Sequence, residues 1–302
     1  MACRFPNEID YQIPQEWTRK VEKLPPKVDV LVGSSRAKSV ETQLAKTHPD
    51  PSNLIIHAKS SAKLYDLSGK AINIIQSKHL DPYTTDVKVY FLAGYCDLTE
   101  MLMGANYEEV VFLEDVEHAV QRVIYNIDQA SSYITSFNFS PVFSTIPPGN
   151  LDIWNNTRFL QRKTNFLNYS SRYQEMNKNI IQAIVQINKH ILAKNIQNSV
   201  STPYVASTIM DNHPGFDRHG NRYPPRVHYS RLVDGVHPTE KLSNNWARAL
   251  LKAMKKNRGL LPHKPQQSPG CLNPNLLNDS FDLQNIKIQE NMRDDAIRAA
   301  LH

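Results

Sequence analysis

Two short segments, far apart in the chain, carry residue types that together can activate a hydroxyl group. The first is the turn Gly33-Ser34-Ser35, which follows an apolar run, and the second is Asp234-Gly235-Val236-His237. A serine becomes a nucleophile when an imidazole takes its proton and a carboxylate orients that imidazole. We therefore take Ser35, His237 and Asp234 as candidate nucleophile, general base and orienting carboxylate.

Each of these residues also has a purely structural interpretation. Ser35 could cap the helix that follows it, because serine is favoured at helix N-termini. His237 could simply begin a helix, and Asp234-Gly235 could be an ordinary turn. A second Asp-x-x-His, from Asp115 to His118, is interpreted as the solvated face of a helix, without a role in chemistry.

The hydrophobic pattern predicts strands that alternate with helices. Short β-branched or apolar runs are typical of buried parallel strands, and they predict strands at 28–33, 54–58, 86–94, 139–146 and 203–210. Helical spacing of apolar residues predicts helices over 69–78, 107–130, 172–194 and 239–256. This alternation indicates an α/β fold, a flavodoxin-like three-layer α/β/α sandwich whose parallel sheet has the order 2-1-3-4-5.

Such a topology would bring the distant segments to one edge of the sheet. Ligands bind beyond the carboxyl ends of parallel strands, at the point where the strand order reverses. Ser35 follows the first strand, the residues 94–97 follow the third, and Asp234 and His237 precede the last helix. We therefore expect these three stretches to converge on one site.

The same residues resemble the sequence blocks of the SGNH (GDSL-type) hydrolase superfamily. That family has Gly-Asp-Ser after strand one, a glycine in the next loop, Gly-x-Asn-Asp after strand three, and Asp-x-x-His before the last helix. Here the blocks read VLVGSSRAK, LSGKAINII, FLAGYCDLT and VDGVHPTEKL, over roughly residues 27–258. The fourth block is intact, whereas Ser34 replaces the aspartate of the first and Cys96 the asparagine of the third.

The resemblance implies a serine esterase that hydrolyses short acyl or acetyl esters through an acyl-enzyme intermediate, with no metal or organic cofactor. It implies an oxyanion hole formed by the backbone N–H groups of Ser35 and Gly69 and by the side chain of Cys96. A thiol is a weak donor, so a rate loss of about 10²–10³-fold is expected unless Tyr95 or a backbone N–H compensates. Nothing in the sequence lowers the pKa of Cys96 or marks it as a nucleophile itself.

The two departures leave open a second class of function, a catalytically impaired protein of this fold that acts as a binding module. Its partner could be nucleic acid, because seven basic and no acidic residues lie between Glu240 and Asp279, in a chain of net charge +6. A solvated helix face with a solubilising tail is the alternative. A phosphate-binding loop built on GSSRAKS is disfavoured, since it lacks the Gly-Lys-Ser/Thr ending.

The segment 213–231, HPGFDRHGNRYPPRVHYSR, precedes the last block and is rich in arginine and histidine. It is long enough to overhang the site, and we hypothesise a lid that favours anionic or sugar-bearing substrates. A basic surface loop is the structural alternative.

The overall composition is that of an ordinary globular protein, with 40% hydrophobic and 21% charged residues among 302. We divide the chain into a lead-in (1–26), an SGNH-hydrolase-like α/β domain (27–258) and a basic, largely disordered tail with a possible terminal helix (259–302). No signal sequence or membrane-spanning run is predicted, and three scattered cysteines form no disulfide framework. The expected location is intracellular, cytoplasmic or nuclear. The expected partners are a small-molecule, glycan or lipid ester, and nucleic acid through the basic tail.

Overall fold

The computed structural model describes residues 25–104, 107–112, 115–162, 170–211 and 226–262. Nearly all of the predicted lead-in and tail, and most of the predicted lid at 213–231, therefore lie outside the described residues. Within those ranges, no helix combines the length and the apolar character needed to cross a bilayer.

Four parallel strands form the central sheet, in the order β2-β1-β3-β6. They are β1 (Lys27–Gly33), β2 (Leu54–Ala58), β3 (Asp86–Leu92) and β6 (Ser140–Phe143). Most of β1 and β3 is buried, as expected for strands covered on both faces. In the sheet register Gly33 lies between Ala58 and Leu92. Three strands therefore end at the same edge, and the loops that follow them start side by side.

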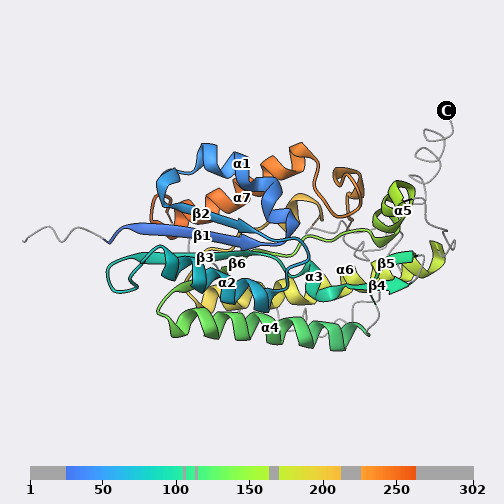
Figure 1. The fold of residues 1–302 in the computed structure, drawn as a ribbon, viewed down its shortest axis with the longest axis horizontal. Coiled ribbons are helices and arrows are strands. Elements are labelled where there is room, and N and C mark those ends of the chain that lie inside the picture. Colours follow the sequence, from blue (N-terminus) through green and yellow to red (C-terminus); the bar gives the residue numbers. More distant parts are fainter. Residues whose placement is uncertain (1–24, 105–106, 113–114, 163–169, 212–225, 263–302) are drawn as a thin grey trace, which may run out of the picture.

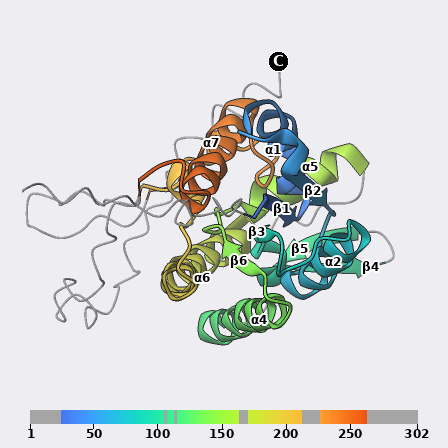
Figure 2. The same cartoon turned by 90° about the vertical axis from the view of Figure 1, so that its left-hand side faces the viewer.

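Helices cover both faces of the sheet, which confirms the predicted three-layer α/β/α class (Figure 1 and Figure 2). One face carries α1 (Ser35–Thr47) and α7 (Glu240–Asn257), and the other carries α2 (Leu64–Ser77), α4 (Val116–Ser136) and α6 (Ser170–Gln197). Each face has its own hydrophobic core. Leu31 and Trp246 belong to the first, and Phe91, Ile72 and Val123 to the second. Burial of these side chains is the main favourable term that holds the layers together.

The predicted helix over 107–130 is wrong in its first part. Residues Tyr107–Val111 form β5, an antiparallel partner of β4 (Glu100–Gly104), and α4 begins only after Asp115. A short apolar run such as Val110-Val111 is compatible with both a helix and a strand. Here pairing with β4 makes it a strand. The hydrophobic pattern did not predict three helices, namely α1, α3 (Tyr95–Leu98) and α5 (Leu151–Arg162).

The predicted fifth strand at 203–210 is also wrong. That segment contains the 3₁₀ helix η3 (Ala206–Thr208) and, at Met210, an isolated bridge to Val227. Further 3₁₀ turns are η2 (Pro51–Asn53) and η4 (Tyr229–Arg231). The described sheet thus matches the first four positions of the predicted order and ends at β6.

Asparagine side chains of α6 take the place of a fifth strand. Asn195 accepts a hydrogen bond from the Phe143 N–H at 3.0 Å and donates to the Phe143 carbonyl at 2.7 Å. Asn188 pairs in the same way with Ile146, at 2.7 and 3.0 Å. A carboxamide offers the same donor and acceptor as a peptide group. These two side chains therefore satisfy backbone groups that an edge strand would otherwise leave unpaired.

Candidate active site

The three residues with the predicted chemistry come together at the carboxyl edge of the sheet. Nε2 of His237 lies 2.8 Å from Oγ of Ser35, and Nδ1 of the same ring lies 2.7 Å from Oδ2 of Asp234. The His237 and Asp234 side chains are 32% and 20% exposed, respectively. The arrangement is a continuous chain from carboxylate to imidazole to hydroxyl, at a position that solvent can reach.

Ser35 is the first residue of α1, immediately beyond β1. Ser34 occupies the N-cap position and makes no side-chain capping bond. The Ser35 hydroxyl is turned to His237 instead, so the capping interpretation does not describe either serine. The first N–H groups of a helix lack partners within the helix and carry the positive end of its dipole. The Ser35 N–H is therefore well suited to bind a developing oxyanion.

The Asp234 carboxylate holds its own loop as well as the imidazole. Oδ1 accepts hydrogen bonds from the backbone N–H groups of Val236 at 3.0 Å and His237 at 2.7 Å. Burial acts to raise the pKa of Asp234. The hydrogen bonds from the His237 ring and from these two N–H groups outweigh burial and hold that pKa below its usual value. The carboxylate is thus kept ionised, as an orienting acceptor must be.

Gly235 allows the Asp234 loop to approach the start of α5. Its φ is +84°, and a Cβ at this position would lie 2.5 Å from the Asn150 carbonyl oxygen. The Asn150 N–H donates to the Gly235 carbonyl at 2.7 Å. One turn into α5, the ring of Trp154 lies 5.3 Å from the His237 ring, centroid to centroid. The loop after β6 and the start of α5 therefore contact the segment that carries Asp234 and His237.

Arg36, the residue after Ser35, ties the same loops together from inside. Its side chain is buried, and Nε donates to the Val236 carbonyl at 3.1 Å. Its two terminal nitrogens donate to the carbonyls of Pro147 at 2.6 Å and Pro148 at 3.4 Å. The guanidinium also lies 4.3 Å from the centroid of the Tyr95 ring. One side chain thus joins the start of α1, the loop after β6 and the Asp234–His237 loop.

Burial lowers the pKa of the Arg36 guanidinium, while Tyr95, Cys96 and Asp234 act to raise it. An arginine nevertheless stays protonated in a protein, so a positive charge lies inside the site without a direct carboxylate bond among the residues described. Carbonyl oxygens and an aromatic face solvate it instead. Only a planar group with several donors can make all of these contacts at once.

We expect Arg36→Met to lower the rate of ester hydrolysis by about 10²-fold, because the His237 loop loses its tie to α1 and small displacements of reacting groups are costly. It should also destabilise the fold by about 2–4 kcal/mol, since buried carbonyls lose their donor. Steady-state kinetics and urea denaturation measure the two effects. Arg36→Lys, which keeps the charge and part of the bonding, should fall between wild type and Arg36→Met. Wild-type kinetics in Arg36→Met would contradict the positioning role.

The oxyanion role expected for Gly69 does not fit its position. Gly69 lies within α2, beyond the first four amides that a helix leaves unpaired. Its N–H therefore belongs to the hydrogen-bond ladder of the helix. The connection between β2 and α2, residues 59–63, contains no glycine, and the sequence pattern does not distinguish a loop glycine from a glycine inside a helix.

Cys96 lies on α3, beyond β3, and is partly buried. Burial raises the pKa of its thiol, although the nearby Arg36 charge acts to lower it. The side chain makes no hydrogen bond within the described part of the chain. The neighbouring Tyr95 hydroxyl, the expected substitute, is buried without a hydrogen-bond partner there. A contribution of Cys96 to oxyanion binding stays a prediction.

Asp97, which matches the last residue of the third block, supports the site as a structural group. It is fully buried, and both carboxylate oxygens lie 3.3 Å from the N–H of Leu64, the first residue of α2. The side-chain amide of Asn126 donates to it at 3.2 Å. Burial raises the pKa of Asp97 to about 6, and these hydrogen bonds only partly offset that effect.

This raised pKa predicts a stability change with pH. Between the unfolded value of about 4 and the folded value of about 6, the folded protein binds more protons than the unfolded chain. Stability from this group is therefore lost as pH rises from about 4 to about 6. We expect Asp97→Asn to be more stable than wild type by about 1–3 kcal/mol at pH 8 and much less so at pH 4.5. Urea denaturation at both pH values measures this, and an equal difference at both would contradict it.

The second Asp-x-x-His begins a helix and does not lie within one, contrary to our interpretation. Asp115 is the N-cap of α4, and its Oδ1 accepts a hydrogen bond from the His118 N–H at 2.9 Å. Both residues are exposed. The motif has the same local capping bond as Asp234 and His237, but its imidazole faces solvent.

Sequence analysis did not identify Arg36, Asn150 or Trp154. The rule that ligands bind beyond the carboxyl ends of strands was applied to the first and third strands only. Applied to the fourth, it would have pointed to Pro147-Pro148-Gly149-Asn150, the loop that contacts both Arg36 and Gly235. Nothing in the sequence indicates the contact between Trp154 and His237, which depends on how α5 is placed.

No protein-family model and no curated protein sequence matches this chain. Solved structures that are similar to it include a GDSL-like lipase from Bacteroides thetaiotaomicron, with 14% identity and a TM-score of 0.44 over 78% of this chain and 89% of the other. A phospholipase A1 from Streptomyces albidoflavus has 13% identity and a TM-score of 0.40 over 76% and 99%. The catalytic domain of a peptidoglycan O-acetyltransferase from Streptococcus pneumoniae has 13% and 0.37 over 78% and 96%.

At these identities and TM-scores, the assignment of the fold rests on features of the chain itself. The parallel sheet has the order β2-β1-β3-β6, and Ser35 directly follows β1. Asp234 and His237 stand directly before the last described helix, α7. The strand order and these positions are those of the SGNH-hydrolase fold.

Proposed function

We propose that the protein is a serine esterase that hydrolyses short acyl or acetyl esters through an acyl-enzyme intermediate. The observation that carries the proposal is the hydrogen-bonded chain from Asp234 through His237 to Ser35, with distances of 2.7 and 2.8 Å. The substrate is proposed to be a small-molecule, glycan or lipid ester, since the chemistry acts on the ester bond alone.

In this proposal His237 Nε2 takes the proton of Ser35 as Oγ attacks the ester carbonyl. Asp234 accepts the Nδ1–H of the imidazole and stabilises its charged form. His237 then returns the proton to the leaving alcohol, so the C–O bond of the ester breaks as an acyl bond to Ser35 remains. A water molecule, deprotonated by His237, releases the acid and restores the serine hydroxyl.

The oxyanion is assigned first to the Ser35 N–H, at the N-terminus of α1. A second donor is needed, since Gly69 does not qualify. The Lys59 N–H donates to the Gly33 carbonyl at 3.0 Å, so the turn that follows Lys59 starts beside the end of β1. We assign the second donor to a backbone N–H of Ser60 or Ser61, and we keep Cys96 as a weak third.

The competing proposal, a catalytically impaired binding module, draws its support from Ser34 and Cys96. Ser34 is buried and makes no side-chain capping bond, so its departure from the family pattern affects packing more than chemistry. Cys96 replaces the asparagine that would donate to the oxyanion, so its weakly donating thiol would lower the rate of ester hydrolysis. The two functions differ in whether Ser35 is activated, which is a property that a chemical probe can read.

The test is a fluorophosphonate probe together with a series of p-nitrophenyl esters from acetate to octanoate. Covalent labelling at Ser35, located by peptide mass spectrometry, and turnover that is fastest with acetate would support the esterase. Labelling with faster turnover of octanoate would contradict the short-acyl assignment only. A chain that neither labels nor hydrolyses any of these esters would overturn the proposal and favour the binding module.

A further inference from the structure

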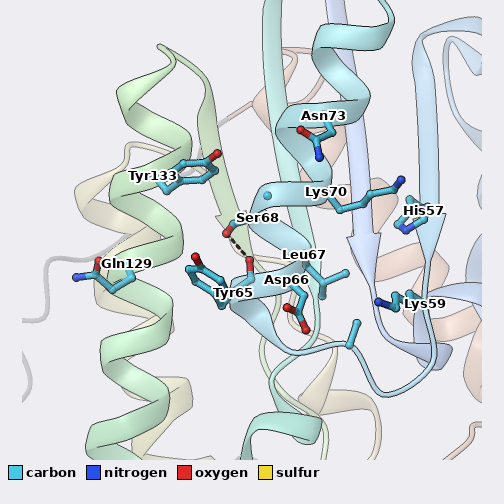
Figure 3. Close-up of a pocket in the computed structure, with 12 residues that line it drawn as sticks. His57, Lys59, Tyr65, Asp66, Leu67, Ser68, Lys70, Asn73, Gln129 and Tyr133 are labelled. Carbon is cyan, nitrogen blue, oxygen red and sulfur yellow. Dashed lines mark hydrogen bonds between the residues drawn. The ribbon is translucent and has the colours of Figure 1, made fainter.

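A second candidate site lies on the face of the molecule formed by α2, α4 and the end of β2. A hollow of about 700 Å³ opens there, and none of Ser35, Asp234 and His237 lines it. Figure 3 shows its lining side chains on both sides of α2. The proposed hydrolase chemistry uses none of the side chains that line this hollow.

One end of the hollow is basic. Lys59, Lys70 and His57 line it, and Figure 3 shows Lys70 extending toward His57. Neither lysine forms an ion pair with a described residue, and Nε2 of His57 is buried with no hydrogen-bond partner there. Burial and the two lysine charges lower the pKa of His57. Asp66 is the one acid of the lining, so the two lysine charges outnumber the negative charge among the lining residues.

The other end is aromatic. Tyr65 of α2 and Tyr133 of α4 both line the hollow, and their side chains lie between the two helices in Figure 3. The two residues are 75% and 43% exposed. Exposed tyrosine rings beside a basic groove are the arrangement on which bases stack in proteins that bind single strands.

Gly69 joins the two ends. Residues four apart lie on the same face of a helix, so Tyr65 and Gly69 form one row on α2, with Asp66 and Lys70 in the next. A glycine within a helix costs about 1 kcal/mol relative to alanine. Close packing does not require a glycine at this position, because a Cβ at Gly69 would meet no atom within 4 Å. The bare backbone leaves room for a ligand to cross α2 from the aromatic to the basic end.

We propose that this hollow binds a nucleotide, with its phosphate between Lys59 and Lys70 and its base against Tyr65. The ligand class follows from the two ends together, since a phosphate alone would not need the rings and a neutral aromatic would not need the charges. This is a binding function separate from the proposed hydrolase, and it assigns nucleic-acid binding to the α2–α4 face and not to the basic C-terminal stretch. The nucleotide is either free or part of a single strand.

The test is fluorescence anisotropy of 5′-labelled (dT)₁₂ with the full chain over a range of salt concentrations. Lys59→Ala/Lys70→Ala should weaken binding at least about tenfold and reduce the slope of log K against log[salt] by about 0.7, for the one phosphate that the two lysines would neutralise. Lys241→Ala/Lys252→Ala removes the same charge from exposed positions of α7 and should change affinity less than about twofold. Equal losses in both pairs, or no binding by wild type, would overturn the proposal.

Gly69→Leu separates a ligand role from a structural one. Leucine favours a helix and meets open space here, so the melting temperature should not fall, while binding should be lost because the side chain fills the hollow. A variant that binds as wild type would overturn the proposal. If AMP displaces the labelled strand, a free nucleotide is sufficient for binding. If AMP does not displace it, the ligand is a nucleotide within a single strand. Ser35→Ala should bind as wild type, so this proposal and the hydrolase stand or fall separately.

Discussion

Ser35→Ala should reduce ester hydrolysis by about 10⁴-fold or more, to the level that binding alone supports. The physical reason is that Oγ is the atom that forms the acyl bond, and no neighbouring group can replace it. The fold should be unaffected, because the Ser35 hydroxyl bonds only to the partly exposed His237 ring. Turnover of p-nitrophenyl acetate and fluorophosphonate labelling measure the loss, and thermal denaturation verifies the fold.

Ser34→Ala is the matched control for this substitution. It removes the same hydroxyl from the adjacent residue, which makes no side-chain capping bond to α1. Its activity should stay within a few-fold of wild type. If Ser35→Ala retains wild-type turnover, or if both alanine variants lose activity alike, the assignment of the nucleophile is wrong.

Asp234→Asn should lower the rate by about 10³–10⁴-fold while leaving the loop in place. The asparagine carbonyl can still accept the N–H groups of Val236 and His237, which bond to Oδ1 in the structure. In place of Oδ2, asparagine has an NH₂ group, which cannot accept the Nδ1–H of His237. The imidazole then adopts the wrong tautomer, in which Nε2 no longer accepts the serine proton. The measurement is the rate constant of hydrolysis together with the urea midpoint.

The chain supplies its own control in Asp115→Asn. Asp115 makes the same capping bond to the N–H three residues later, at 2.9 Å, but its motif faces solvent at the start of α4. This variant should hydrolyse esters at the wild-type rate, and an asparagine is nearly as good an N-cap as an aspartate. Comparable losses of activity in Asp234→Asn and Asp115→Asn would show that the effect is one of capping and not of chemistry.

The parts of the fold that could be predicted are those with one dominant hydrophobic pattern. The runs at 28–33 and 54–58 became β1 and β2 almost residue for residue, and the periodic stretches became α6 and α7. The mistakes fell where a short apolar run fits two structures. Val110-Val111 went into β5 because β4 lies beside it. Residues 203–210 stayed out of the sheet, and the side chains of Asn195 and Asn188 pair with the backbone of Phe143 and Ile146 instead.

Of the candidate site, the sequence by itself determined the residue types and the local turns. An aspartate followed three residues later by histidine makes the same capping bond at Asp115 and at Asp234, because that bond depends on local backbone geometry alone. Only the tertiary structure decided which of the two imidazoles meets a serine, since that contact joins residues 202 positions apart. It depends on parallel strands ending at one edge and on the buried guanidinium of Arg36 that holds the loops there. Contacts of this kind are set by packing over the whole molecule, which no short stretch of sequence encodes.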